Sequence, residues 1–211
     1  TTVAVLTSHN VDTTLWTRRG ELADEINEQH TNRSYLGESS LPESLRANCD
    51  IEQAVSGADV IAMAVPSQGF HSVVNELSKF VGAGVPIVSL SKGLEQSTFK
   101  RMSEVISEVM PRNPVAVLSG PNLAKEILAG QPAASVIACS DESIARELSA
   151  VFSRPTFRLY TNPDVIGCEI GGVVKNVVAI ASGTARSLSI AVLKSALNLA
   201  SGSFFRSSTA R

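Results

Sequence analysis

Short β-branched runs alternate along the chain with longer segments whose apolar residues recur at helical spacing. This order is typical of βαβ units, which build a parallel sheet with helices on both faces. It predicts an α/β fold with a Rossmann-like, doubly wound and mostly parallel sheet. Strands are expected at Asp12–Thr17, Leu45–Cys49, Asp59–Val65, Pro86–Leu90, Val115–Leu118, Ser135–Ala138 and Phe157–Tyr160. Helices are expected at Glu21–Gln29, Gln68–Phe80, Thr98–Val109, Leu123–Ala129 and Ser143–Phe152.

The two ends of the chain differ from this alternating pattern. The opening segment Thr1–Leu6 is β-branched, yet it is expected to end a crossover helix, because Asp12–Thr17 would be a second parallel strand. From Cys168 to about Leu199 the sequence contains no proline, and its apolar residues recur at helical spacing. This stretch indicates the start of an all-helical second domain after Asp164. No structure is expected for residues 201–208.

Composition and charge exclude several classes of protein. With 18 Lys+Arg against 20 Asp+Glu, the formal net charge is −2, which argues against a nucleic-acid partner held by bulk positive charge. Hydrophobic residues make up 44% of the 211 residues, which is enough for a sizeable core. The apolar run Val173–Ala181 is interrupted by Lys175 and Asn176, so no membrane span is expected.

Cysteine and histidine residues indicate neither a disulfide framework nor a metal site. The three cysteines are far apart and form no CxxC pair. The three histidines lie in different segments, without cysteine or acidic partners at ligand spacing. Unpaired cysteines fit the reducing cytoplasm, where the protein is expected to reside. These residues are Cys49, Cys139, Cys168, His9, His30 and His71.

Residues that follow the predicted strands are the first candidates for ligand binding, because doubly wound sheets bind ligands beyond the carboxyl ends of their strands. Arg18 and Arg19 follow Asp12–Thr17, where such folds place an acid for the ribose of NAD or a cation for the 2′-phosphate of NADP. Two arginines favour NADP(H). A solvated pair at the start of a surface helix is about equally compatible with the local sequence.

Lys92 and Gly120 follow two further strands. In the turn Ser91-Lys92-Gly93, the lysine can meet a substrate or a nicotinamide as a compact cation, although an exposed lysine without such a role is the commoner case. Gly120, in Ser119-Gly120-Pro121-Asn122, permits close approach of the backbone just before a helix N-terminus that can bind an anion. A plain strand-to-helix turn is equally compatible with these residues.

One lysine interrupts the apolar stretch near the end of the chain. Lys175 lies beside Asn176 and shortly after Gly171-Gly172, a pair that permits close approach of another group. A cation on a largely buried helix needs a partner or a chemical role. A lysine that reaches solvent from a core helix is the alternative. Lys175 is therefore the principal candidate for proton transfer.

Five segments taken together are more specific than any one of them. They are Leu15–Arg19, Ala64–Gln68, Ser89–Glu95, Leu118–Pro121 and Gly171–Gly183. In order and in spacing they resemble the bacterial NAD(P)-dependent sn-glycerol-3-phosphate dehydrogenase family. The resemblance covers nearly all of residues 1–183.

This resemblance implies a reaction and a domain organisation. The reaction is the reversible reduction of dihydroxyacetone phosphate to sn-glycerol 3-phosphate for glycerophospholipid synthesis, with NADPH preferred and NAD possible. Residues 1–163 would form a dinucleotide-binding domain that lacks its first strand. Residues 164–211 would begin a helical substrate domain, of which residues 184–211 are atypical. A homodimer is possible.

The resemblance also implies roles for individual residues. Lys175 matches the proton donor and acceptor at the substrate oxygen, and Lys92 matches a lysine that touches both cofactor and substrate. The other implied positions are Gly120 and Asn122 for the substrate, and Ala124, Arg18 and Arg19 for the cofactor.

The sequence departs from the family pattern at both ends. No G-x-G-x-x-G turn is present, and Thr1 corresponds to a position just inside the first helix, so we expect about 20–25 preceding residues. Asn122-Leu123 stands where the family usually has Ser or Thr followed by Phe, and Thr184–Arg211 resembles no part of its helical domain. Two alternatives therefore stay open: an inactive dinucleotide-fold fragment, and a related 3-hydroxyacid dehydrogenase or ketopantoate reductase.

Overall fold

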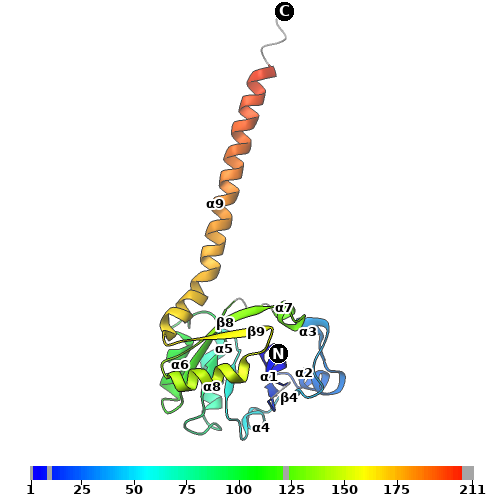
Figure 1. Ribbon diagram of the computed structural model, residues 1–211, viewed down its shortest axis with the longest axis vertical. Helices are drawn as coiled ribbons and strands as arrows, with labels where there is room; N and C mark the ends of the chain where they lie inside the picture. The colour runs from blue at the N-terminus through cyan, green and yellow to red at the C-terminus, as the bar shows by residue number, and fades with distance from the viewer. Residues whose placement is uncertain (1, 9–10, 121–123, 206–211) are drawn as a thin grey trace, which may run out of the picture. The chain divides into compact units, whose positions relative to one another are not determined.

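The computed structural model of the chain describes residues 2–8, 11–120 and 124–205 (Figure 1). Two compact units are present, Thr1–Gly172 and Val173–Arg211, and each is described by itself. Helix α9 (Val165–Phe205) runs through the division between them. The domain boundary expected at residues 163/164 stays a prediction.

A five-stranded sheet forms the centre of the first unit. Its strands stand in the order β5-β6-β7-β8-β9, and all neighbours are parallel except β7 and β8. This arrangement confirms the expected α/β fold with a mostly parallel sheet. The strands are β5 (Ile61–Met63), β6 (Ile87–Ser89), β7 (Val115–Ser119), β8 (Ala133–Cys139) and β9 (Phe157–Asn162).

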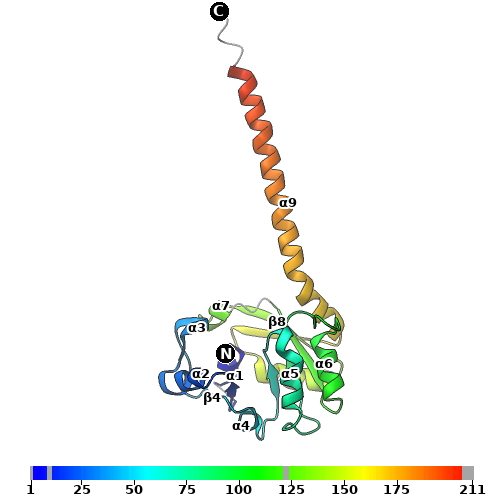
Figure 2. The same cartoon turned by 180° about the vertical axis from the view of Figure 1, so that it is seen from behind.

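Helices cover both faces of this sheet. Helix α8 (Glu142–Phe152) lies on one face, and α5 (Ser67–Leu77) and α6 (Met102–Val109) lie on the other (Figures 1 and 2). Neighbouring residues of β6 point to opposite faces, since Val88 packs with α8 and Ile87 packs with α5 and α6. Helix α5 meets the sheet through four buried residues at i, i+3, i+4 and i+7 spacing, namely Phe70, Val73, Val74 and Leu77.

The N-terminal part contains a helix and a second sheet. Helix α1 (Thr2–Ser8) confirms that the β-branched opening is helical, and it contacts α7 (Ala124–Leu128) and α8. Strand β1 (Thr14–Trp16) pairs in parallel with β4 (Arg46–Asn48) in a separate two-stranded sheet. Helix α2 (Gly20–Asp24) follows β1 and continues as a π-helical turn, η1 (Glu25–Gln29).

Four short elements were not expected from the sequence. They are β2 (Thr31–Asn32), α3 (Arg33–Leu36), β3 (Gly37–Ser40) and α4 (Ile51–Val55). Each is too short to show an apolar repeat. Helix α4 does carry a local signal, because the Asp50 side chain accepts hydrogen bonds from the N–H groups of Glu52 and Gln53.

Two helices begin three or four residues away from the predicted start. Helix α6 begins at Met102 rather than at Thr98, because Leu94 and Arg101 form a β-bridge and Phe99 adopts a positive φ of 56° between them. Helix α9 begins at Val165 rather than at Cys168, since Asp164 Oδ1 accepts the N–H of Gly167 at 2.8 Å. Helix α9 also continues to Phe205, beyond the expected end near Leu199.

Within the described part of the chain, one helical stretch is long and apolar enough to cross a membrane. It is Val165–Arg186, of 22 residues and mean hydropathy 1.5. Lys175 therefore does not interrupt this stretch enough to remove it by length and composition, contrary to the argument from the sequence; the expectation that no membrane span forms stays a prediction. The core helix of a soluble protein can have the same length and composition.

Candidate active site

The carboxyl ends of β5, β6 and β7 lie at one edge of the sheet, because these three strands are parallel neighbours. The segment after β6 is tied to the end of β5. The Leu90 N–H donates to the Met63 carbonyl at 2.8 Å, and the Ser91 hydroxyl donates to the Val65 carbonyl. These bonds fix the start of the loop that carries Lys92.

Lys92 and Gly120, two of the predicted site residues, are brought together at this edge. The exposed Lys92 donates from Nζ to the Gly120 carbonyl at 2.9 Å, across 28 positions of sequence. Gly93, the next residue, has a φ of +122°, and a Cβ there would lie 3.0 Å from Ser67 Oγ at the start of α5. A side chain at Gly93 would therefore be strained and crowded, so glycine keeps the lysine turn close to α5.

Gly120 is also packed against β8, the antiparallel neighbour of β7. A Cβ at this position would lie 2.2 Å from Ser135 Oγ and 3.0 Å from Ser135 Cα. The Cα belongs to a central strand and cannot move aside as a flexible side chain can. The close backbone approach expected at Gly120 is therefore made to β8.

Substitution Gly120→Ala is expected to destabilise the fold by about 1–3 kcal/mol, the usual cost of overpacking a tight site. Urea unfolding followed by circular dichroism would measure this loss. Gly82→Ala is the matched control, because a Cβ at Gly82 would meet nothing within 4 Å. Equal stability of the two variants would show that Ser135 does not confine this position.

Arg18 lies against the first turn of α5. A Cβ at Gly69 would lie 3.1 Å from Arg18 Nη2, so the guanidinium occupies the space that a side chain would fill. No side-chain cap bonds the N-terminus of α5, where Pro66 is the N-cap. A guanidinium beside the N–H groups of a helix N-terminus is a combination that can bind an anionic group. Arg19, also exposed, is the N-cap of α2.

A hydrogen-bonded group that the sequence did not reveal supports the far side of the Lys92 loop. His71 Nδ1 on α5 lies 2.8 Å from Glu95 Oε1, and the Thr98 hydroxyl donates to Glu95 Oε2. The hydrogen bond from Thr98 and then that from His71 lower the pKa of the Glu95 carboxyl below its ordinary value. Only the tertiary structure reveals this group, because residues 71 and 95 lie on different elements.

The lowered pKa of Glu95 predicts a pH dependence of stability. A carboxyl whose pKa is lower in the folded state stabilises the fold above its unfolded pKa, near 4.5, and this contribution is lost as the pH falls through the folded value. Wild type should thus exceed Glu95→Gln in stability near neutral pH, and the difference should narrow in acid. Urea titrations over the acid range would measure the two curves. Glu52→Gln, on the exposed face of α4, is the control, and a pH-independent difference for Glu95→Gln would contradict the prediction.

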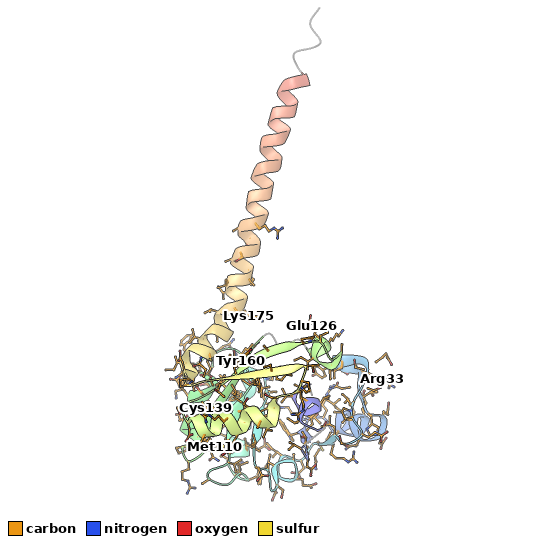
Figure 3. All side chains as sticks on the ribbon, viewed as in Figure 1. Arg33, Met110, Glu126, Cys139, Tyr160 and Lys175 are labelled. Carbon is orange, nitrogen blue, oxygen red and sulfur yellow. The ribbon has the colours of Figure 1, made fainter. Side chains whose placement is uncertain are left out.

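For two of the remaining predicted site residues the structure gives a position in the fold and an exposure. Lys175 lies on α9 and is exposed (Figure 3). Ala124 is the first residue of α7 and is half-buried. Asn122 lies outside the described residues. Among the described residues, no group of three His, Cys, Asp or Glu side chains could hold a metal ion.

Two protein-family models match most of the chain. Residues 1–145 match the family model described as the N-terminus of NAD-dependent glycerol-3-phosphate dehydrogenase. Residues 164–201 match the model for the C-terminus of the same enzyme. The chain belongs to the NAD(P)-dependent glycerol-3-phosphate dehydrogenase family. The second match extends past Gly183, where the sequence resemblance was expected to end.

Individual members of the family agree with this assignment. A glycerol-3-phosphate dehydrogenase [NAD(P)+] 2 of Sphingopyxis alaskensis is 50% identical over 183 residues, which are 87% of this chain and 55% of that protein. The corresponding enzyme of Corynebacterium diphtheriae is 50% identical over 188 residues, 88% of this chain and 57% of that protein. The crystal structure of glycerol-3-phosphate dehydrogenase from Coxiella burnetii superposes with a TM-score of 0.82 at 32% identity, over 90% of this chain and 58% of that one.

Family membership confirms part of what the sequence predicted. It confirms the resemblance, the Rossmann-like fold and an NAD(P)-dependent oxidoreductase family. It also replaces the competing 3-hydroxyacid dehydrogenase and ketopantoate reductase assignments. The chain spans about half the length of the curated relatives it matches. The roles of single residues stay predictions.

Proposed function

We propose that the full-length protein reversibly reduces dihydroxyacetone phosphate to sn-glycerol 3-phosphate and so supplies the head-group precursor of glycerophospholipids. The observation that carries the proposal is the Lys92 turn at the carboxyl edge of the sheet, where Lys92 Nζ meets the Gly120 carbonyl at 2.9 Å. Ligands of doubly wound sheets bind at this edge. Membership of the dehydrogenase family supplies the reaction class.

Lys175 and Lys92 have different roles at the substrate oxygen. Lys175 donates a proton to the oxygen in reduction and takes it back in the reverse direction. Lys92 places a positive charge near the developing negative charge, and its loop is held by hydrogen bonds to β5 and α5. The nicotinamide, when bound, supplies the hydride. Gly120, Asn122 and Ala124 complete the proposed substrate and cofactor contacts.

We infer that NADPH is the preferred cofactor and that NAD is also accepted. Support comes from the Arg18 guanidinium at the first turn of α5, in the space left by Gly69. A 2′-phosphate would find a charged donor there, and Arg19 adds a second positive charge after β1. A ribose hydroxyl would gain much less from these two cations.

We place the enzyme in the cytoplasm, without a membrane span, and infer that a homodimer is possible. The described cysteines are unpaired, as is usual in reducing compartments. The apolar stretch Val165–Arg186 carries Lys175 near its middle, where a bilayer would penalise a charge. In a protein outside a membrane, the Lys175 ammonium can reach solvent or a ligand, so the same composition has a smaller cost there.

The test is NADPH oxidation by the full-length protein, followed by the absorbance of the reduced nicotinamide, with and without dihydroxyacetone phosphate. We expect NADPH oxidation that depends on dihydroxyacetone phosphate. We expect none with ketopantoate or with 3-oxoacids, the compounds that a 3-hydroxyacid dehydrogenase would reduce. Oxidation that is indifferent to dihydroxyacetone phosphate would refute the proposal. The same assay on the 211-residue chain tests the remaining alternative, an inactive fragment, for which we expect little or no turnover.

A further inference from the structure

A buried carboxylate near the start of α9 accepts hydrogen bonds from several donors. Glu169 is only 7% exposed, although it lies on the first turns of the helix. Its Oε1 accepts the N–H of Ser103 at 3.0 Å, and its Oε2 accepts Nη1 of Arg101 at 2.9 Å. The Ser103 hydroxyl also donates to Oε2. The carboxylate is thus bound to residues 66 and 68 positions earlier in the chain.

The partners of Glu169 lie where the Lys92 loop ends. Arg101 forms the β-bridge with Leu94 that closes this loop, and it is the N-cap residue of α6. The Glu95 N–H donates to the Lys100 carbonyl at 2.9 Å and joins the same two segments. Glu169 therefore connects the beginning of α9 to the closing point of the loop that presents Lys92.

The same turns of α9 touch the sheet edge on another side. A Cβ at Gly172 would lie 3.2 Å from Ser119 Oγ and 4.0 Å from Lys92 Cγ. Glycine at this position lets the helix backbone pass close to the lysine stem. Lys175 follows Gly172 by three residues, about one helical turn, in the same helix.

Stability alone is a weak reason for a carboxylate at this position. Removing a charge from water costs free energy that its ion pair only partly returns, and well-packed apolar side chains often serve as well. The three hydrogen-bond donors restrict the Glu169 carboxylate to one orientation, because each of its oxygens must face its own donors. A second carboxylate, that of Glu104, also pairs with Arg101, with Oε1 at 3.0 Å from Nη2, but it is half-exposed and lies on α6 rather than on α9.

We propose that Glu169 is a positioning residue, whose carboxylate ties the helix that carries Lys175 to the loop that carries Lys92. The inference rests on the proposed function of these two lysines. Glu169 acts through Arg101 and Ser103 and needs no contact with substrate. Its removal would let the helix start and the loop end move independently, and misplacement by about 1 Å can lower a rate by about 100-fold.

The test compares Glu169→Gln with Glu104→Gln in the full-length protein. Both changes remove one carboxylate from Arg101, but only Glu169 belongs to α9, and Glu104 is half-exposed. We expect Glu169→Gln to lower kcat about 10- to 100-fold with the KM for NADPH nearly unchanged, and Glu104→Gln to leave both within about two-fold. An unchanged kcat in folded Glu169→Gln protein would overturn the inference.

Arg101→Met breaks the same contact from the other partner and does not need Glu169→Gln to fold. If Glu169 acts through Arg101, Arg101→Met alone should also lower kcat about 10- to 100-fold, and where both single variants fold, the double variant should be no slower than the slower of them. Independent, multiplying losses of kcat would contradict a shared mechanism.

Amide hydrogen exchange separates this inference from the proposed function. Glu169→Gln should speed exchange in peptides that cover residues 165–172 and 99–104, whereas Glu104→Gln should leave residues 165–172 unchanged. Unaltered exchange at 165–172 in Glu169→Gln would refute the connection. If wild type shows no turnover with dihydroxyacetone phosphate but exchange responds as expected, the proposed function fails and the structural connection stands.

Discussion

Lys175→Ala should lower the kcat of dihydroxyacetone phosphate reduction by about 100- to 10,000-fold, the range that a positioned general acid contributes. The loss arises because Lys175 is the group assigned to deliver the proton to the substrate oxygen in the transition state. Steady-state kinetics of the full-length protein, together with the Kd for NADPH from fluorescence titration, would measure it. The Kd should change little, since the adenosine end of the cofactor is assigned to Arg18 and Arg19.

Lys79→Ala is the matched control for Lys175→Ala. Lys79 is exposed just after α5 and also loses one positive charge on substitution. Its kcat should equal that of wild type. Full activity in Lys175→Ala would remove Lys175 from the mechanism. A rise in KM alone would mean that Lys175 binds the substrate without transferring a proton.

The double substitution Arg18→Ala with Arg19→Ala should weaken NADPH binding by about 10- to 150-fold. A hydrogen bond to a charged group contributes about 1.5–3 kcal/mol, which corresponds to this range of Kd. Binding of NADH, which has no 2′-phosphate, should change by less than about three-fold. Isothermal titration calorimetry with both cofactors would give the ratio.

Arg146→Ala controls for the loss of positive charge in this comparison. Arg146 is exposed on α8, where it pairs with Glu142. It should leave both cofactor affinities unchanged. An equal loss of NADPH and NADH binding in the double variant would contradict the assignment of the arginines to the 2′-phosphate. High salt should reduce the preference for NADPH, because it screens exposed charges.

Most of the central sheet and its helices could be predicted from local patterns. Helix α5 is an example, since its apolar positions Phe70, Val73, Val74 and Leu77 recur at the spacing that predicts one buried face. The segment from Thr31 to Ser40 could not be predicted, because its strands and helix have two to four residues each and show no period. The start of α6 was misplaced because a β-bridge to Leu94 holds Arg101 outside the helix.

The candidate site was partly predictable for a similar reason. Lys92 and Gly120 each follow a parallel strand, and the carboxyl ends of neighbouring parallel strands share one edge, so their proximity follows from the strand pattern. The crowding of Gly120 by Ser135 does not follow from it, since this contact depends on the antiparallel pairing of β7 with β8. The ion pair of Glu169 and Arg101 could not be predicted from the sequence either, because Arg101 is the N-cap residue of α6 and Glu169 lies on α9.

The sequence by itself determined the α/β class, the family and the cations that follow the strands, because these depend on short-range patterns and on the order of motifs. Only the tertiary structure decided which groups meet: Lys92 with Gly120, Arg18 with the turn at Gly69, and Glu169 with Arg101. Local periodicity tells which side of an element is apolar, but not which distant element packs there. Contacts between residues tens of positions apart are set by strand order and by the fit of side chains.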